Sequence, residues 1–303
     1  YFTFDVTEVD QRLGVGISDL VINEGSYVVA YVYAPDGGSV GSAVCYQSSS
    51  GCDINVRAAK VGRYSVVVQP TYATQTMAFR SWVSNDLHMV MTPELPVQLD
   101  IARRGQNARL YIDAQAGETL AVMIAGQSTH PAARLVYYQL YTPEGTLLTS
   151  NYVTGSEVLR MASAPKAGRY MVFVDPQEGA MLQSRVTLTA GQQTAMAIDG
   201  AVGEFIAPIA GHPVYFTFDA TVPDQRLGLG FSDMQVSTGS YFSAYIYGPD
   251  GTPVTGVTCY PSQVTCAVNL RAIAVGRYSV VVTPQAADQL IRFTATLSND
   301  LYL

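Results

Sequence analysis

The four cysteines carry the most specific chemistry in this chain. Cys45 and Cys52 form one close pair, Cys259 and Cys266 form another, and both pairs occupy the same place in a sequence repeat. Zinc would favour a tighter C-x-x-C spacing with further Cys or His residues nearby. Placement on a segment with hairpin character favours two local disulfides instead. Because disulfides persist in oxidising compartments, the pairs predict a secreted or cell-surface protein.

The three histidines do not form a catalytic set. A hydrolase needs a nucleophile, a base and an orienting acid, but His88, His130 and His212 lie in unrelated sequence contexts. His130 and His212 each precede a proline, which is typical of turns. No G-x-S-x-G, H-E-x-x-H or Walker motif occurs in the strand-to-helix context that its chemistry requires. We therefore expect no enzymatic activity and no cofactor.

Three aspartates recur 214 residues further along the chain. The pairs are Asp5 with Asp219, Asp10 with Asp224, and Asp19 with Asp233. Recurring carboxylates could chelate calcium, which needs six or more oxygen ligands. Aspartate is also common where strands end and turns begin. We favour this structural interpretation and assign no metal ligand.

Tyrosine is abundant, with 20 residues in 303, and some tyrosines are regularly placed. Tyr27, Tyr31 and Tyr33 should share one face of a strand, with Tyr46 close by in the sequence. Their counterparts are Tyr241, Tyr245, Tyr247 and Tyr260. Such a strip could stack on sugar rings, or it could belong to the core or to a contact between domains. We favour the core or a contact.

The strands that must position these groups are organised around a recurring Gly-Arg-Tyr segment. It reads VGRYSVVVQP over residues 61–70, AGRYMVFVDP over 167–176 and VGRYSVVVTP over 275–284. β-Branched and aromatic residues between a glycine and a proline predict a strand in the interior of a sheet. We expect these segments to be the most buried, with Val67 and Val281 in the core.

Glycines punctuate the neighbouring strands. Gly14 and Gly16 lie within one predicted strand, and Gly228 and Gly230 lie within its counterpart. Glycine weakens a strand, so these positions predict a bulge or the close approach of a neighbouring segment. The Pro-Asp-Gly sequence at 249–251 predicts a reverse turn.

The repeats divide the chain into three domains, at residues 1–89, 90–193 and 194–303. Residues 1–89 align with 215–303 without a gap, and about half the positions are identical; the middle segment is a diverged copy without cysteines. Short strands separated by turn residues, without a helical stripe, predict an all-β fold of three tandem β-sandwich domains of jelly-roll or Ig-like type. The short joints contain apolar alternation, so we expect a semi-rigid rod.

The first repeat differs from the others at its start. We interpret residues 97–101 and 204–209 as the first strands of the second and third domains, and the first repeat, starting at Tyr1, lacks such a strand. An unfilled strand position offers backbone donors and acceptors to another chain. This predicts that neighbouring copies or adjacent domains of the same protein join head to tail through the Tyr1–Phe4 side, in a longer rod or fibre.

Composition excludes several classes of partner. Only 14% of the residues are charged and the net charge is −7. Nucleic acids and anionic membranes attract clusters of Lys and Arg, so we expect no nucleic-acid partner. No apolar run approaches the roughly 18 residues that a membrane-spanning helix needs.

Residues 105–189 carry a family resemblance. The pattern GQNARLYIDAQAGETLAVMIAG, LYTPEGTLL, APKAGRYMVFVDP and SRVTLT resembles the bacterial pre-peptidase C-terminal (PPC-like) β-sandwich domains. It is more similar still to tandem modules of giant secreted bacterial YD-repeat and related surface proteins, and the outer repeats fit the same frame through YFTFD, YGPDG and VGRYSVVV. The paired cysteines are not part of the general pattern, and the acidic calcium-binding motif of some PPC-like domains is not evident.

Two functions are compatible with these observations. The resemblance implies a non-catalytic appendage or spacer, which corresponds to an extracellular structural module, a stalk or fibre segment of a bacterial surface or secreted protein. In some relatives such a domain binds carbohydrate or matrix, so the alternative is an adhesin module that binds glycan or host matrix.

Overall fold

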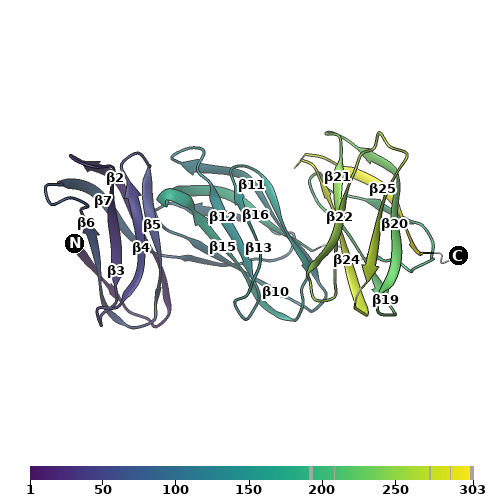
Figure 1. The fold of residues 1–303 in the computed structure, drawn as a ribbon, viewed down its shortest axis with the longest axis horizontal. Helices are drawn as coiled ribbons and strands as arrows, with labels where there is room; N and C mark the ends of the chain where they lie inside the picture. The colour runs from purple at the N-terminus through teal and green to yellow at the C-terminus, as the bar shows by residue number, and fades with distance from the viewer. Residues whose placement is uncertain (191–193, 208, 273, 287, 301–303) are drawn as a thin grey trace.

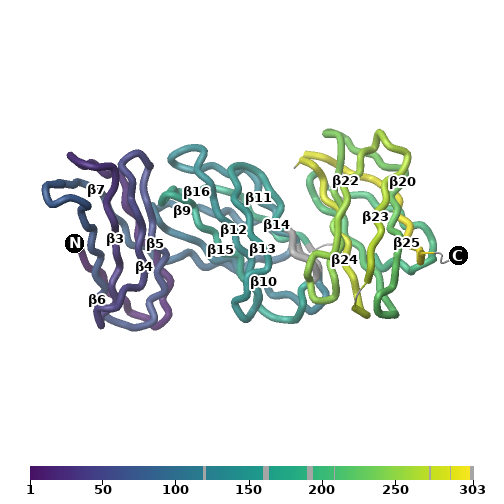
Figure 2. Tube along the Cα trace, in the orientation of Figure 1, coloured from purple at the N-terminus to yellow at the C-terminus, as the bar shows by residue number. Residues whose placement is uncertain are grey.

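A computed structural model describes residues 1–190, 194–207, 209–272, 274–286 and 288–300. These residues form three β-sandwiches in a row, with the two chain ends at opposite ends of the molecule (Figure 1). The chain completes each sandwich before it passes to the next (Figure 2). The predicted all-β fold of three tandem β-sandwich domains is confirmed. No helix in the described residues is long and apolar enough to cross a membrane.

The first sandwich packs a four-stranded sheet against a three-stranded one. Across the first sheet the order is β1 (Phe2–Val6), β6 (Gly62–Gln69), β3 (Tyr27–Tyr33) and β4 (Ser39–Tyr46). The second sheet contains β5 (Gly51–Ala58), β2 (Gln11–Ile22) and β7 (Met77–Asn85). The side chains between the two sheets form a single apolar core.

The second sandwich has the same plan with two additional strands. Its first sheet contains β13 (Leu147–Val153), β12 (Val136–Tyr141), β15 (Gly168–Pro176), β10 (Ala108–Ala114) and β8 (Leu87–Val90). Its second sheet contains β14 (Glu157–Ser163), β11 (Thr119–His130), β16 (Met181–Ala190) and β9 (Val97–Ile101). A 3-10 turn, η1 (Gln177–Gly179), follows β15.

The third sandwich repeats the second. Its first sheet contains β17 (Thr194–Ala195), β19 (Val214–Ala220), β24 (Gly276–Pro284), β21 (Phe242–Tyr247) and β22 (Pro253–Cys259). Its second sheet contains β18 (Gly203–Ile206), β25 (Ile291–Asn299), β20 (Gln225–Val236) and β23 (Thr265–Ala272).

Each residue of the Gly-Arg-Tyr segment has a structural role. Gly62 has a φ of 136°, and a Cβ there would come within 2.8 Å of Cγ of Pro35, in the turn that follows β3. The arginine pairs with an aspartate on the adjacent strand, at 2.9 to 3.1 Å, and the tyrosine is buried with its hydroxyl group donating to a carbonyl oxygen four residues earlier. The arginine pairs are Arg63–Asp5, Arg169–Asp113 and Arg277–Asp219, and the tyrosines are Tyr64, Tyr170 and Tyr278. The arginine and the tyrosine of the motif therefore make the same contacts in all three domains.

The expectation that Val67 lies in the core is wrong, because successive side chains of a strand point to opposite faces. Tyr64 and Val66 point into the core, whereas Val67 is half-buried on the outer face of β6. Its counterpart Val281 is fully buried, in a cluster with Ala121 of the second domain. The burial of Val281 therefore reports a contact between domains.

The strands adjust the expected domain starts. β9 occupies the predicted residues 97–101 and pairs with β16. β18 lies where the sequence predicts a strand at 204–209 and pairs with β25, and Pro208 of that range lies outside the described residues. β8 crosses the predicted boundary at residue 89 and pairs with β10 of the second sandwich. By pairing, the second domain therefore includes Leu87. Residues 191–193, at the next boundary, also lie outside the described part.

The second sandwich has the edge strands β8 and β9, and the third has β17 and β18 at the equivalent positions. In the described residues of the first sandwich, no strand occupies these positions. Its core is less covered at this edge. Phe2 and Phe79 are half-buried, whereas their counterparts Phe216 and Phe293 are 0% and 1% exposed. In the third domain Phe205 of β18 stacks on both, with centroids 4.7 and 5.3 Å apart.

Candidate functional site: the junctions between domains

The first and second domains meet at two glycines in β2. Gly14 and Gly16 are buried against the turn before β10, where Gly105 has a φ of 70°. A Cβ on Gly14 would overlap the carbonyl oxygen of Gly105, and a Cβ on Gly16 would overlap that of Arg104. Only glycine allows two backbones to approach this closely. The close neighbour expected from the sequence is therefore present in the first domain.

Polar side chains surround this approach. Asn107 Nδ2 donates to Asn55 Oδ1 at 2.6 Å and to Asp86 Oδ1 at 3.3 Å. Asn55 Nδ2 donates to Asp175 Oδ2 at 3.1 Å, and Arg109 pairs with the buried Asp86 at 2.8 Å. Hydrogen bonds between groups shielded from water are sensitive to geometry, so these contacts fix how the two domains face one another.

Two carboxyl groups at this junction are electrostatically strained. Burial, followed by the negative charge of Asp175, raises the pKa of Asp53 from 3.8 to about 7, although a hydrogen bond from the Gly179 amide opposes the shift. Asp53 keeps some exposed surface, but protein atoms crowd its carboxyl group. Burial also raises the pKa of Asp175, whose Oδ1 has no hydrogen-bond partner within the described residues. Docking the two domains therefore favours protonation here.

The second and third domains meet through apolar side chains instead. Ala121 of β11, at the strand position equivalent to Gly14, is buried against Tyr215 of β19 and Val281 of β24. Tyr247 packs against the same cluster. The two junctions therefore use the same pair of sandwich faces with different chemistry, one polar and backbone-to-backbone, the other apolar.

Truncating the same valine in two domains should test this assignment. Val281→Ala should lower the free energy of unfolding of the third domain by about 1–2 kcal/mol, because it deletes two buried methyl groups. Val67→Ala, on the open outer face of the first domain, should change stability by about 0.5 kcal/mol or less. Urea unfolding of the two variants measures the difference, and equal losses would contradict the assignment.

The tyrosine strip lies on the outer face of the first sheet, so the prediction that it belongs to the core is wrong. The alternative, a contact between domains, is correct for one of its tyrosines, Tyr247. Val28, Ala30 and Val32 of β3 face the core instead. In the third domain Tyr247 packs at the junction. Two pairs remain partly exposed, Tyr27 with Tyr46 and Tyr241 with Tyr260, with ring centroids 5.6 and 5.7 Å apart.

The recurring aspartates have structural partners. Asp5 pairs with Arg63, Asp10 with Arg57 and Asp19 with Arg80 in the first domain, and Asp219 and Asp224 have equivalent partners in the third. Asp10, Asp19, Asp224 and Asp233 adopt positive φ angles of 49° to 60°. Within the described residues no group of three or more His, Cys, Asp or Glu could hold a metal ion. Asp5 and Asp219 therefore lie near strand ends and Asp10 and Asp224 in turns, as expected. Asp19 and Asp233 instead lie inside β2 and β20, each at a register shift of the strand.

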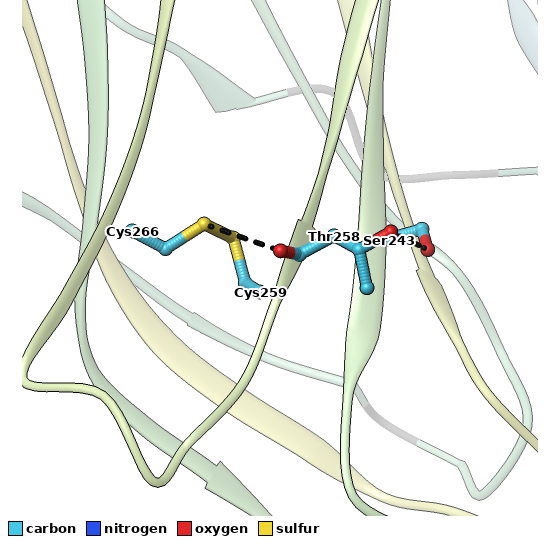
Figure 3. The surroundings of a disulfide bond; sticks show 4 residues. All are labelled: Ser243, Thr258, Cys259 and Cys266. Atoms are coloured by element: carbon cyan, nitrogen blue, oxygen red, sulfur yellow. Dashed lines mark hydrogen bonds between the residues drawn. A yellow bond between two sulfur atoms is a disulfide. The ribbon is translucent and has the colours of Figure 1, made fainter.

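Both predicted disulfides are present. Cys45–Cys52 and Cys259–Cys266 have Cα atoms 5.2 and 5.5 Å apart. The expected hairpin is wrong, however, because the two cysteines of each pair lie on strands of different sheets: β4 pairs with β3 and β5 with β2, while β22 pairs with β21 and β23 with β20. Each bond therefore links the two sheets of a sandwich, and Figure 3 shows the bond between Cys259 and Cys266. Two buried disulfides indicate folding in an oxidising environment.

Removing one disulfide should have a moderate effect. Cys45→Ser should lower the free energy of unfolding of the first domain by about 2 kcal/mol, because closing a loop of about eight residues contributes roughly this much. The sole tryptophan, Trp82 of β7, reports unfolding of this domain by its fluorescence. Reducing agent should lower the stability of the parent protein but not of the Cys45→Ser variant; equal sensitivity in both would contradict the prediction.

The histidines lie in separate settings. His88 of β8 contacts the hydroxyl group of Tyr111 at 2.9 Å, and burial lowers the pKa of His212. His130 lines a depression of about 350 Å³ together with Asp100 and Ser128. No hydrogen bond among the described residues links these three side chains into a nucleophile–base pair. The absence of catalysis stays a prediction.

Comparison with known proteins shows no matching family model and no matching curated protein. Among solved structures, the triple jelly roll of an archaeal virus turret has 10% identity and a TM-score of 0.23, covering 97% of this chain and 80% of that one. The CUB1-EGF-CUB2 domains of rat MASP-1 have 8% identity and a TM-score of 0.23, covering 69% and 100%. Similarity this low adds nothing to the sheets described above.

Proposed function

We propose that this chain is a non-catalytic structural module, a stalk or fibre segment of a secreted or cell-surface bacterial protein. The observation that carries the proposal is the direct packing at both junctions. The backbone of Gly105 packs directly against Gly14, and Ala121 packs on Val281. Domains held by interlocking faces keep a fixed spacing, which a spacer requires. Disulfides that brace two of the three sandwiches suit an extracellular setting.

The first domain supports end-to-end continuation. Its edge at β1 and β7 lacks the strands that cover the equivalent edge in the other two sandwiches, and Phe2 and Phe79 stay half-buried there. On its outer face Tyr1 is 93% exposed, whereas the counterpart Tyr215 is 3% exposed against the second domain. A neighbouring copy or an adjacent domain that adds strands here would cover both surfaces.

Distances between domains test the proposal. Spin labels on unnatural amino acids at the exposed Val44, Leu147 and Val254 place one label in each domain. A semi-rigid rod gives a narrow distance distribution for each neighbouring pair. Broad distributions for both pairs would show domains that move independently and would rule out a spacer of fixed length.

The bacterial origin and the PPC-like family remain part of the proposal. Their support is the sequence pattern over residues 105–189 together with a chain of tandem β-sandwiches. A spacer of this kind would connect other domains to a cell surface. Detection of the protein on intact cells by an antibody, without permeabilisation, tests its location.

Glycan binding is the second candidate, and the exposed tyrosine pairs favour it. Tyr46 and Tyr260 are 47% and 42% exposed, and each lies beside a second ring in a pair that recurs in both outer domains. Exposed aromatic rings can stack on the apolar faces of sugars. A glycan array with the parent protein and a Tyr46→Ala/Tyr260→Ala variant tests it: binding lost in the variant supports an adhesin, and no binding by the parent contradicts it.

A further inference from the structure

The third domain presents a face that is occupied in the first. Part of the surface that receives the second domain at the first junction recurs in sequence 214 residues later. Six positions are identical: Gly14 and Gly228, Gly16 and Gly230, Ser18 and Ser232, Asn55 and Asn269, Ser84 and Ser298, Asp86 and Asp300. The two sandwiches therefore share the glycine-centred part of this face, and they differ where Ser50, Gly51 and Asp53 are replaced by Val264, Thr265 and Ala267.

The surroundings of the two faces differ. Ser18, Ser84 and Asp86 are 0%, 4% and 5% exposed at the first junction. Their counterparts in the third domain have accessible surface, and those of Ser84 and Asp86 are exposed. A Cβ on Gly228 would meet nothing nearer than Ser298 Oγ at 3.7 Å, whereas a Cβ on Gly14 would overlap a backbone carbonyl.

Gly228, in the middle of β20, has no internal explanation, whereas a Cβ on Gly230 would come within 3.0 Å of Thr296 Oγ1 of the same domain. Glycine in a strand costs roughly 0.5–1 kcal/mol relative to alanine. At Gly14 the close approach of Gly105 accounts for the residue, but no described segment approaches Gly228 in the same way. The third domain keeps a glycine that the first domain needs for docking, so we expect a docking partner with a backbone turn of similar shape.

We propose that the face around Gly228 and Gly230 is a docking site for a β-sandwich of the kind formed by residues 90–193, joined in series as the second domain is to the first. The partner supplies a turn like Arg104–Gly105 that lays its backbone over the two glycines, and an amide like that of Asn107 that donates to Asn269. The occupant is not a second copy of the chain. In such a copy, the first domain already covers the face of the second domain that would have to dock here.

One difference predicts a property of this third junction. Asp53 is replaced by Ala267, so the carboxyl group with a raised pKa is absent. The docked pair at the third domain should therefore show less dependence on pH than the first junction does. This inference rests on the proposed rod, and it adds the kind of domain that binds to the exposed face of the third sandwich.

An extended chain tests the site. Residue 303 is the counterpart of residue 89, so a second copy of residues 90–193 can be appended directly after residue 303. Spin labels report the distance across each of the three junctions in one polypeptide. We expect the new junction to give a distribution as narrow as the first, centred at a similar distance.

Matched variants separate the possible outcomes. Gly228→Ala should broaden only the new junction, and Gly14→Ala only the first, while Gly228→Ala in the 303-residue chain should not lower the free energy of unfolding. A broad new junction beside narrow first and second junctions overturns the docking site but leaves the rod intact. Broad distributions at the first two junctions overturn the rod itself. A narrow new junction that survives Gly228→Ala also overturns the site, because docking would then use another face.

Discussion

Replacing Gly14 with alanine should release the first domain from the second while both remain folded. The added methyl group would overlap the carbonyl oxygen of Gly105, which is backbone and has no flexible end to move aside. Ordinary overpacking costs about 1–3 kcal/mol, and a backbone clash at a docking face is relieved most easily by separating the faces. Alanine suits a strand better than glycine, so the first sandwich itself should not be weakened.

Two measurements check this result. The distance between labels on the first and second domains should change from one narrow distribution to a broad one, and the fluorescence of Trp82, which lies opposite Gly16 on β7, should report the altered surroundings. Gly228→Ala is the matched control, since its Cβ meets nothing nearer than Ser298 Oγ at 3.7 Å. An unchanged distance distribution in Gly14→Ala would mean that the two domains do not dock through this face.

Local motifs could be predicted from the sequence because their determinants lie close together along the chain. The Gly-Arg-Tyr strands, the turn before Gly251 and both cysteine pairs are where the sequence places them. The hairpin assigned to the cysteines was wrong because sequence spacing cannot distinguish a turn within one sheet from a crossing between two. Cys45 lies in β4 and Cys259 in β22, both in the first sheet of their sandwich, and each chain then crosses to the second sheet before it reaches the other cysteine.

The junctions could not be derived in the same way, since each depends on residues far apart in the chain. Asn55 and Asp175 are 120 residues apart, and nothing local to either predicts their hydrogen bond. Val67 and Val281 have nearly identical neighbours in sequence but different burial, because only one faces another domain. The glycine pairs were the one available signal: residues that weaken a strand indicate that something else needs the space.

The first junction should also weaken as the pH rises. Asp53 has a pKa of about 7 in the docked protein against an ordinary value of 3.8, so between these values the docked state holds a proton that the unfolded chain has released. Stability therefore falls as the pH rises from about 4 to about 7. The raised pKa of Asp175 acts in the same direction. Exposed aspartates such as Asp5, whose pKa is lowered by Arg63, act in the opposite direction and mainly below pH 4.

Asp53→Asn should remove most of this dependence. An asparagine Oδ1 can still accept the hydrogen bond from the Gly179 amide, but it carries no charge beside Asp175. We expect the variant to be more stable than the parent at pH 8, by on the order of 2 kcal/mol, and nearly equal to it at pH 4. Urea unfolding followed by Trp82 fluorescence from pH 4 to pH 8 measures both. Parallel pH profiles for parent and variant would show that Asp53 does not control the junction.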